Sequence, residues 1–229
     1  MSDTALATFT EGENVPAHIL KSKAYTSGVG RGNEEVGQNL TIPRVKQLQK
    51  MSNEVDKHHG DYVVDADPGD FFNSLTRENY GDELFVISLK FKTEYVVWKS
   101  REAGGGYGGA FSTDVEAATF IAKQDKPEEW VPEETHSHVL LIKNPDTGDL
   151  SRTPVIMDFS RSKLRVSKAW NSQIGDKGGD RFAALWRLYP VSTANRAGEQ
   201  FLNLGIDFAG WCKKEDYEAA EALFEGFTD

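Results

Sequence analysis

The sequence predicts a mainly β fold: an OB-fold-like small barrel with inserted helices, followed by an acidic C-terminal helix. Short runs of β-branched and aromatic residues recur along the middle of the chain and are separated by turns rich in Gly, Pro, Asn and Asp. A basic stretch with helical periodicity lies between the later runs, and the chain ends in an acidic stretch with the same periodicity. Antiparallel strands interrupted by one helix match the OB-fold best among small barrels.

The bulk composition predicts a soluble protein of a reducing compartment. The 229 residues suffice for one sizeable domain, and a hydrophobic fraction of 38% fits a folded domain with polar ends. Cys212 is the only cysteine, which excludes a disulfide framework and a cysteine zinc cluster. No apolar run approaches the ~18 residues of a membrane span, and the first residues lack the pattern of a signal peptide. We therefore expect no membrane contact.

We expect three parts. Residues 1–38 contain five glycines and few large apolar side chains, which predicts a flexible N-terminal arm. Residues 39–212 form the predicted OB-like, nucleic-acid-binding domain. Residues 213–229 form the predicted acidic amphipathic helix or tail.

The first ordered element is predicted to be a short helix over residues 39–49. Thr41 suits the N-cap and Pro43 suits the first turn. The apolar face would consist of Ile42, Val45, Leu48 and Gln49. The cations outside this face would keep a surface helix solvated or form a second phosphate-binding patch.

Strand patterns dominate the chain from residue 52 onward. The predicted strands are 62–64, 71–75, 83–91, 94–99, 138–142, 153–159, 182–189 and 201–208. Strands 83–91 and 94–99 would form one hairpin, turning at Lys92 and Thr93, and strands 138–142 and 153–159 another. Residues 113–124 predict a helix capped by Thr113, and the acidic, proline-containing stretch 126–134 predicts a loop.

Residues 160–187 invert the charge of the chain. Seven cations face two carboxylates there, a local charge of +5 in a protein of net charge −10. On a helix, Arg161, Arg165 and Lys168 would share one stripe. A second, apolar stripe would contain Val166, Ala169, Trp170, Gln173 and Ile174. A solvated surface helix is one interpretation, and a binding site for a polyanion is the other. Trp170 is predicted to belong to the core rather than to stack on a ligand.

A glycine-rich segment, residues 101–111, carries five glycines around Tyr107. It lacks the Gly-Lys-Ser/Thr ending of a phosphate-binding loop and the spacing of a dinucleotide fingerprint. Trp98, Arg101 and Phe111 stand at its margins. It predicts either a long mobile hairpin loop or a loop that closes over single-stranded bases by stacking.

The last fifteen residues contain six acids and no base, with aromatic residues at helical spacing. Two interpretations remain open. The segment is either a helix docked on the barrel as ordinary core or a mobile competitor for the DNA-binding site.

Little in the sequence indicates catalysis. His136 and His138 would point to the same side of a strand and so begin a metal site, but no cysteine or carboxylate cluster accompanies them. Exposed or incidental histidines are the preferred interpretation, also for His58 and His59. The motifs of hydrolases, zinc proteases and P-loop proteins are absent. We expect a protein that is not an enzyme and needs no cofactor.

Three stretches, residues 39–49, 98–106 and 163–171, together resemble a family of tailed-bacteriophage proteins associated with replication and recombination. In size, β-rich pattern and acidic aromatic tail, the chain is also similar to T7-type phage single-stranded DNA-binding proteins. That resemblance implies an OB-fold that binds the strand, and a tail that occupies the basic groove or recruits replication proteins. The tail departs from the pattern, since Phe227 stands two residues before the end and the acids are spaced helically.

The expected function is therefore non-catalytic binding of single-stranded DNA in phage replication or recombination, in the cytoplasm of the infected bacterial host. Phage replication proteins are expected partners of the acidic segment. The candidate nucleic-acid-binding residues are Arg161, Lys163, Arg165, Lys168, Lys177, Arg181, Trp98, Arg101, Tyr107 and Phe111. The alternatives are a phage structural or host-interaction protein, such as a virion component or a DNA mimic, and a metal-dependent nuclease or ligase accessory enzyme, which the scattered acids do not favour.

Overall fold

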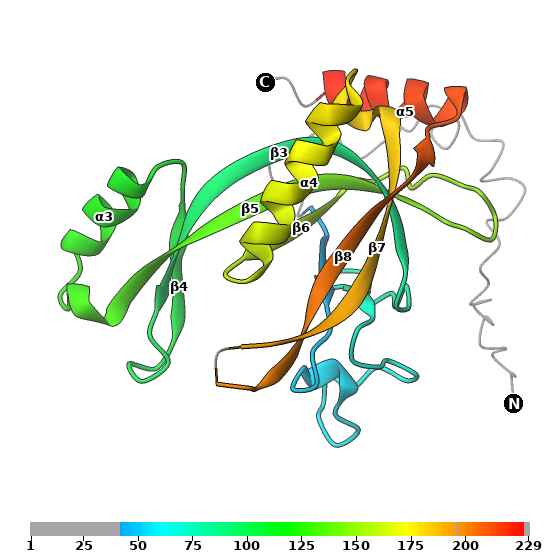
Figure 1. The fold of residues 1–229 in the computed structure, drawn as a ribbon. Coiled ribbons are helices and arrows are strands. Elements are labelled where there is room, and N and C mark those ends of the chain that lie inside the picture. The colour runs from blue at the N-terminus through cyan, green and yellow to red at the C-terminus, as the bar shows by residue number, and fades with distance from the viewer. Residues whose placement is uncertain (1–41, 196, 227–229) are drawn as a thin grey trace, which may run out of the picture. The chain divides into compact units, whose positions relative to one another are not determined.

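The structure, a computed structural model, describes residues 42–195 and 197–226 (Figure 1). The predicted arm, 1–38, lies outside these residues. Within them, eight strands form one curled half-barrel sheet accompanied by three α-helices. The strands are β1 (Arg44–Gln47), β2 (Phe71–Asn73), β3 (Leu84–Lys99), β4 (Gly106–Phe111), β5 (Trp130–Lys143), β6 (Val155–Ser160), β7 (Ala184–Ala194) and β8 (Gln200–Trp211). The helices are α3 (Asp114–Ala122), α4 (Lys163–Lys177) and α5 (Lys214–Glu225), with short 3₁₀ turns at Asn53–Val55, Pro127–Glu129 and Arg181–Ala183.

The sheet order is β2-β1-β6-β5-β3-β7-β8, with β4 paired to β3. The mainly β class is confirmed. So are the predicted strands near 71–75, 182–189 and 201–208, and the hairpin of β5 with β6. The helix capped by Thr113 is also confirmed: the Thr113 side chain accepts from the Glu116 backbone N–H and the Glu116 side chain reciprocates, which is a capping box.

The predicted hairpin over 83–99 is wrong, because β3 is one continuous strand of 16 residues. Lys92 and Thr93 contain no Gly, Pro or Asn to enforce a turn, and β5 pairs with them and with their neighbours on both sides. A register shift between Ser88 and Lys90 locally bends the pair. The predicted loop over 126–134 is wrong for the same reason, since β5 begins at Trp130 and needs these acidic residues as the partners of β3.

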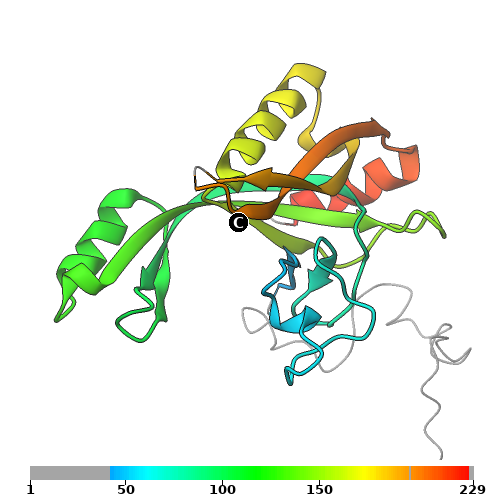
Figure 2. The same ribbon diagram turned by 60° about the horizontal axis from the view of Figure 1, so that its bottom comes forward.

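The outer halves of β3 and β5 leave the curled sheet and carry β4 and α3 with them. We call this extension the wing (94–99, 106–122 and 130–135). It projects away from the remaining strands in both views (Figures 1 and 2). On one of its faces, fully buried Val97 and Ala117 pack between the strands and α3. The opposite face is left open.

The predicted helix at 39–49 is also wrong within the described residues, where Arg44–Gln47 is the strand β1. Val45 and Gln47 are buried and Arg44 and Lys46 are exposed, which is the period of two of a strand. In so short a segment, the period of two of a strand and the period of 3.6 of a helix both place nearly the same apolar residues on the buried face, so the sequence does not distinguish them. The predicted strand 62–64 is not a strand either, but part of a series of turns.

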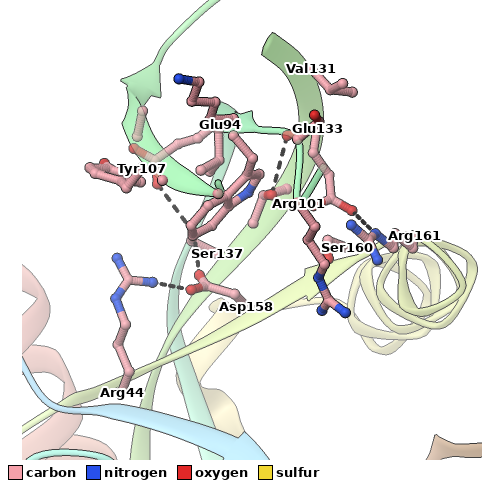
Figure 3. Close-up of a pocket in the computed structure, with 18 residues that line it drawn as sticks. Arg44, Glu94, Arg101, Tyr107, Val131, Glu133, Ser137, Asp158, Ser160 and Arg161 are labelled. Atoms are coloured by element: carbon pink, nitrogen blue, oxygen red, sulfur yellow. Dashed lines mark hydrogen bonds and ion pairs between the residues drawn. The ribbon is translucent and has the colours of Figure 1, made fainter. Parts of the chain in front are cut away.

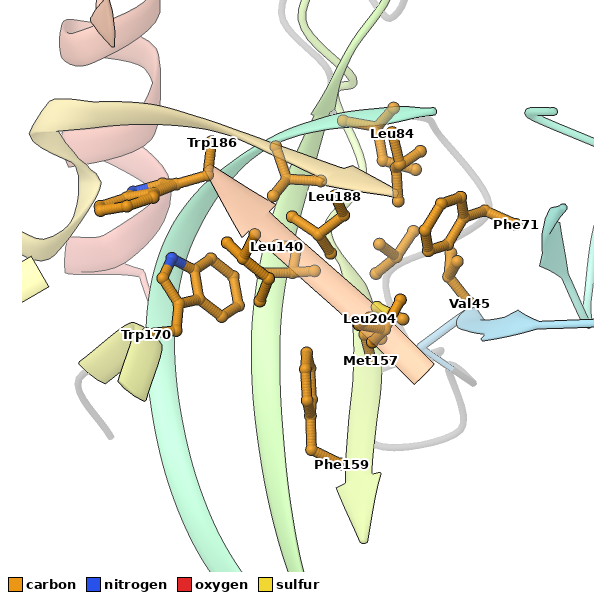
Figure 4. Packing of buried hydrophobic residues seen from close by; sticks show 14 of the residues in the cluster. Val45, Phe71, Leu84, Leu140, Met157, Phe159, Trp170, Trp186, Leu188 and Leu204 are labelled. Atoms are coloured by element: carbon orange, nitrogen blue, oxygen red, sulfur yellow. The ribbon is translucent and has the colours of Figure 1, made fainter. Parts of the chain in front are cut away.

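The helix α4 covers the main core, as predicted for the basic stretch. Trp170 is fully buried and lies edge-on to Trp186, with their ring centroids 6.1 Å apart (Figure 4). The predicted apolar stripe is only partly correct, because Ala169 and Gln173 are exposed. Arg161 precedes the helix, in a turn with φ +51°.

The C-terminal segment is a docked helix in this structure. Ala220 of α5 is fully buried, and Tyr217 and Phe224 contact Phe182 with ring centroids 5.2 and 5.4 Å apart. Lys143 and Asp216 form a largely buried ion pair at 2.7 Å. The described part of the segment is therefore core, as the first of the two interpretations proposed, and Phe227 lies outside the described residues.

Glutamine side chains join the two ends of the curled sheet. Gln49 Nε2 donates to the Leu202 carbonyl at 3.0 Å, and the Leu202 N–H donates back to Gln49 Oε1 at 3.1 Å. Gln47 Nε2 donates to the Asn203 carbonyl at 3.0 Å. Because β8 is the last strand of the sheet, no further strand pairs with its outer edge. The glutamine amides therefore form hydrogen bonds with backbone groups that would otherwise be unpaired.

Gln49→Ala should therefore lower the free energy of unfolding by about 1–3 kcal/mol, because both backbone groups of Leu202 lose their partner. Urea unfolding measures this loss, and hydrogen exchange of the Leu202 amide should accelerate. Lys50→Ala, which removes the exposed neighbouring side chain, is the control and should change neither quantity. Unaltered exchange at Leu202 would contradict this account of the sheet's closure.

Candidate functional site

A pocket of about 960 Å³ lies on the open face of the wing and extends toward β6 (Figure 3). Its floor consists of side chains that project from neighbouring strands at matching positions. Trp98 of β3 pairs with Tyr107 of β4 and with Val131 of β5, and the next set contains Glu133. Because side chains alternate along a strand, residues between these positions point to the opposite face, toward α3 and α4.

The glycine-rich segment is a tight hairpin that joins β3 to β4, so the hairpin of the first interpretation is confirmed, although its turn is short. Gly104, Gly105 and Gly106 adopt φ values of +96°, +68° and +145°, which favour glycine, and β4 begins at Gly106. A Cβ on Gly108 would come within 2.8 Å of the Trp130 ring. The register shifts opposite Val97 and Trp98, and this bulge places Tyr107 directly across from Trp98.

Trp98 and Tyr107 form an exposed aromatic pair. Their ring centroids are 5.5 Å apart with an angle of 62° between the planes, and the residues are 43% and 63% exposed. Both are large apolar side chains that the core does not use. They leave ring faces accessible from the pocket.

Four cations and three carboxylates surround the aromatic pair. Most of the cations are matched to carboxylates: Arg44 pairs with Asp158, Arg161 with Glu133, and Lys99 with Glu129 at 3.2 Å. The Ser137 hydroxyl lies 2.6 Å from Asp158 and 3.2 Å from Glu94 (Figure 3). Arg101 is exposed and forms no ion pair with any described residue.

The two arginines are open to solvent, with 54% of the Arg44 side chain and 80% of the Arg161 side chain exposed. Their partners are less accessible, since Asp158 and Glu133 show 33% and 18% of their side chains. The carboxylates thus hold both guanidinium groups at the edge of the pocket, where an approaching anion can reach them.

Of the ten candidate residues, the structure brings Trp98, Arg101, Tyr107 and Arg161 together in this pocket. The others lie elsewhere. Phe111 packs on Phe120 of α3 on the opposite face, Lys168 lies 3.6 Å from Glu134, and Lys177 lies 3.9 Å above the Phe208 ring. Arg165 lines a second cavity, and burial lowers the pKa of Lys163 to about 8.

Sequence reasoning missed Lys99 and the carboxylates of the pocket, and it considered Arg44 only as part of a second phosphate-binding patch. The alternation of side chains along a strand could have revealed two of these carboxylates, because Glu94 and Glu133 lie on the same face of the sheet as Trp98. That signal required the correct extent of β3 and β5. Arg44 was assigned to a separate patch because its strand was predicted as a helix.

Behind the pocket, on the other face of the sheet, a buried hydrogen-bonded chain connects Arg181 to Glu134. Arg181 Nη2 lies 3.1 Å from His138 Nδ1, and His138 Nε2 lies 2.7 Å from Ser167 Oγ. Ser167 Oγ lies 2.8 Å from His136 Nδ1, and His136 Nε2 lies 3.1 Å from Glu134 Oε1. The prediction of exposed histidines is wrong here, because His136 and His138 are 4% and 0% exposed.

The direction of this chain follows from its first member, since a guanidinium can only donate. His138 Nδ1 must accept and Nε2 must carry the proton. Ser167 then accepts from His138 and donates to His136, which donates to Glu134. Burial lowers the pKa of His138 to about 2, with the nearby charge of Arg181 as the second cause, so His138 is neutral at pH 7.

Arg181 is committed to this chain. It also donates to Asn171 of α4 at 2.7 Å and to Ser88 of β3 at 2.9 Å, and burial lowers its pKa to about 10. The guanidinium therefore remains charged at pH 7 and ties α4 to the sheet. It does not reach the pocket.

Two further kinds of site are not found within residues 42–195 and 197–226. No group of three or more His, Cys, Asp or Glu side chains there is arranged to hold a metal ion. None of the helices described is long and apolar enough to cross a membrane.

The depressed pKa of His138 makes stability depend on pH. Its stabilising contribution is complete above the unfolded-state value of 6.5 and is lost as the pH falls toward about 2. From pH 6 to pH 4 this histidine alone should remove ~1.4 kcal/mol of unfolding free energy per pH unit. In the variant His138→Gln, the new amide can accept from Arg181 and donate to Ser167. Measured by urea unfolding, its free energy of unfolding should therefore fall less steeply with pH, by the same ~1.4 kcal/mol per pH unit.

The matched comparison for this prediction is His58→Gln, which removes an exposed histidine and so leaves the two variants with equal numbers of histidines. Identical pH profiles for the two variants would show that His138 is protonated in the folded protein over this range.

Searches of curated proteins and of solved structures return no match to this chain. One protein family, described as Pam3 phage gp34-like protein, matches residues 10–229. This match spans the wing, the curled sheet and every described helix. The chain therefore belongs to the Pam3 phage gp34-like family of phage proteins.

Proposed function

We propose that the chain binds single-stranded DNA in the pocket on the wing, with the open face of the sheet serving as an OB-fold-like binding surface. The observation that carries the proposal is the exposed pair of Trp98 and Tyr107 among cationic side chains. Aromatic rings beside a cationic groove are the usual means of binding a strand without sequence preference.

Single strands suit this pocket better than duplexes. A ring can stack on a base only if the face of that base is accessible, and in a duplex the neighbouring bases cover it. A volume of about 960 Å³ is near the upper end of small-molecule pockets, which leaves room for more than one nucleotide.

The phosphates would contact Arg101 first, because it has no ion-pair partner among the described residues to give up. Arg44 and Arg161 would follow by exchanging Asp158 and Glu133 for phosphate. Of the cations first considered on the basic helix, this proposal retains only Arg161. Lys163, Arg165, Lys168, Lys177 and Arg181 have no role in this pocket.

We further propose a place in phage replication or recombination within the host cytoplasm. Membership in a phage family supports the phage origin that this role requires. The exposed face of α5 carries Glu218 and Glu221 and is the proposed contact for replication proteins. Because α5 is docked, this contact would recruit a partner rather than compete with DNA.

The stacking part of the proposal predicts that Trp98→Ala and Tyr107→Ala each weaken binding of a labelled oligo-dT by ~1–3 kcal/mol, which is about 5- to 150-fold. Fluorescence anisotropy measures the affinity. Trp211→Ala removes another exposed tryptophan, 57% accessible and outside the pocket, and should leave the affinity unchanged. Equal losses for all three variants, or no binding by the unmodified chain, would reject the proposed function.

The electrostatic part concerns Arg101. Arg101→Gln should reduce the slope of log affinity against log salt by ~0.7, the value for one phosphate contact on a single strand. Lys57→Gln, which removes an exposed lysine remote in sequence from the pocket, should keep the original slope. A slope that Arg101→Gln does not alter would remove Arg101 from the DNA contacts.

A further inference from the structure

The pocket on the wing contains carboxylates, which a site for phosphates alone does not need. Glu94, Glu133 and Asp158 all belong to its lining. Each of them repels a phosphate at close range, so a bound strand must turn another part of itself toward them. An ionised carboxylate can only accept hydrogen bonds, and within a DNA strand the donors are on the bases.

Glu94 differs from the other two carboxylates in its partners. Asp158 and Glu133 are each held by an arginine. Glu94 is held by a lysine through one oxygen, since its Oε1 lies 2.6 Å from Lys92 Nζ. Its other oxygen, Oε2, lies 3.2 Å from the hydroxyl of Ser137 (Figure 3).

The Ser137 hydroxyl has one proton and two carboxylates beside it. Its distance of 2.6 Å to Asp158 Oδ1 is that of a charge-assisted hydrogen bond, whereas 3.2 Å to Glu94 Oε2 exceeds the usual range for a hydroxyl donor. The proton therefore lies on the side of Asp158. Glu94 Oε2 faces a lone pair of the serine oxygen instead, so this acceptor is left for another donor.

The shielding of Glu94 makes that donor matter. Only 16% of its side chain is exposed, so water reaches the carboxylate mainly from the pocket. A strand bound over Glu94 displaces this water. An acceptor that loses water and gains no donor is destabilising, so a strand that brings a donor to this point binds more tightly than one that does not.

The base that meets Glu94 is not the base that stacks on Trp98. Both side chains point into the pocket from β3, four positions apart, which corresponds to ~13 Å along a strand. A pocket of about 960 Å³ has room for more than one nucleotide. Stacking on Trp98 and hydrogen bonding to Glu94 therefore involve different nucleotides of one strand.

We infer that Glu94 selects among bases at this position and favours those with an exocyclic amino group over uracil and thymine. Cytosine presents its N4 amino group, from which a glutamate can accept. Uracil and thymine present a carbonyl oxygen at the same place, which a carboxylate repels. This inference rests on the proposed binding of single-stranded DNA, and it adds a base preference that stacking on the aromatic pair does not supply.

Cytosine and uracil have rings of the same size and present an amino group and a carbonyl oxygen at the same place, so labelled oligo-dC and oligo-dU of equal length provide the test. Fluorescence anisotropy of the full chain should show about tenfold tighter binding of oligo-dC, the effect of one hydrogen bond to a charged group. In Glu94→Gln, the amide can accept from cytosine through its oxygen or donate to uracil through its nitrogen. The two affinities should then agree within about twofold.

Glu102→Gln is the matched control, because it removes the same charge from an exposed residue outside the lining of the pocket. It should keep the preference for oligo-dC. Loss of the preference in both variants would mean that net charge, and not Glu94, determines it, and would overturn the inference. So would a preference that Glu94→Gln leaves intact.

The same titrations distinguish failure of the base preference from failure of the proposed function. If the unmodified chain binds both oligonucleotides equally, and Trp98→Ala weakens both, the DNA-binding pocket stands and the role of Glu94 is rejected. If the unmodified chain binds neither oligonucleotide, the proposed function and the base preference are both rejected.

Discussion

The pairing of β3 with β5 is the constraint on which the rest of this structure depends. The two strands pair from Phe85 with Lys143 to Lys99 with Trp130, without interruption by a turn. Their inner halves form the centre of the curled sheet and bury Val86 and Leu140. Their outer halves continue past the edge of the core and carry the wing. One continuous ladder thus serves both as the centre of the core and as the support of the candidate site.

Two adjacent residues of β5 point to opposite faces of this ladder, one into the pocket and one toward the buried hydrogen-bonded chain. Glu133 points into the pocket and pairs with Arg161, whereas Glu134 reaches the buried chain that begins at Arg181. The buried chain fixes α4 on one face of the sheet, and the turn before α4 brings Arg161 to the other. A change in how α4 sits on the sheet would therefore move a cation of the pocket, although the helix does not line it.

Features with a local cause could be predicted from the sequence. The burial of Trp170 and the capping box of α3 each depend on residues within a few positions, and Trp98, Arg101 and Tyr107 belong to one hairpin. Features that depend on residues far away in the sequence were not predicted. Nothing near Lys92 and Thr93 indicates that a strand much later in the chain keeps them extended, and the burial of His138 requires Arg181, 43 positions away.

The candidate site also contains residues that local sequence could predict and residues that depend on distant parts of the chain. Arg161 joins the pocket because it begins the turn that follows β6. The positions of Arg165 and Lys177 depend instead on the direction of α4, which packing on the core determines. Helical periodicity predicts which residues share a face of the helix, but it does not predict which part of the protein that face packs against. The basic stretch was therefore recognisable as a helix, yet its cations serve different places.

The closure by Gln49 has a consequence for how the protein is made. Its partner Leu202 lies 153 positions later, and β1 pairs in parallel with β6, which is also distant in the chain. A ribosome synthesises from the N-terminus, so β1 and its antiparallel neighbour β2 emerge long before β6 and β8. The parallel neighbour of β1 and the backbone partners of Gln47 and Gln49 are thus synthesised late, and folding of such non-local sheets is slow. Until β6 and β8 have emerged, the edge of β1 that later pairs with β6 and the amides of Gln47 and Gln49 lack these partners, so nascent copies on one messenger can pair with each other.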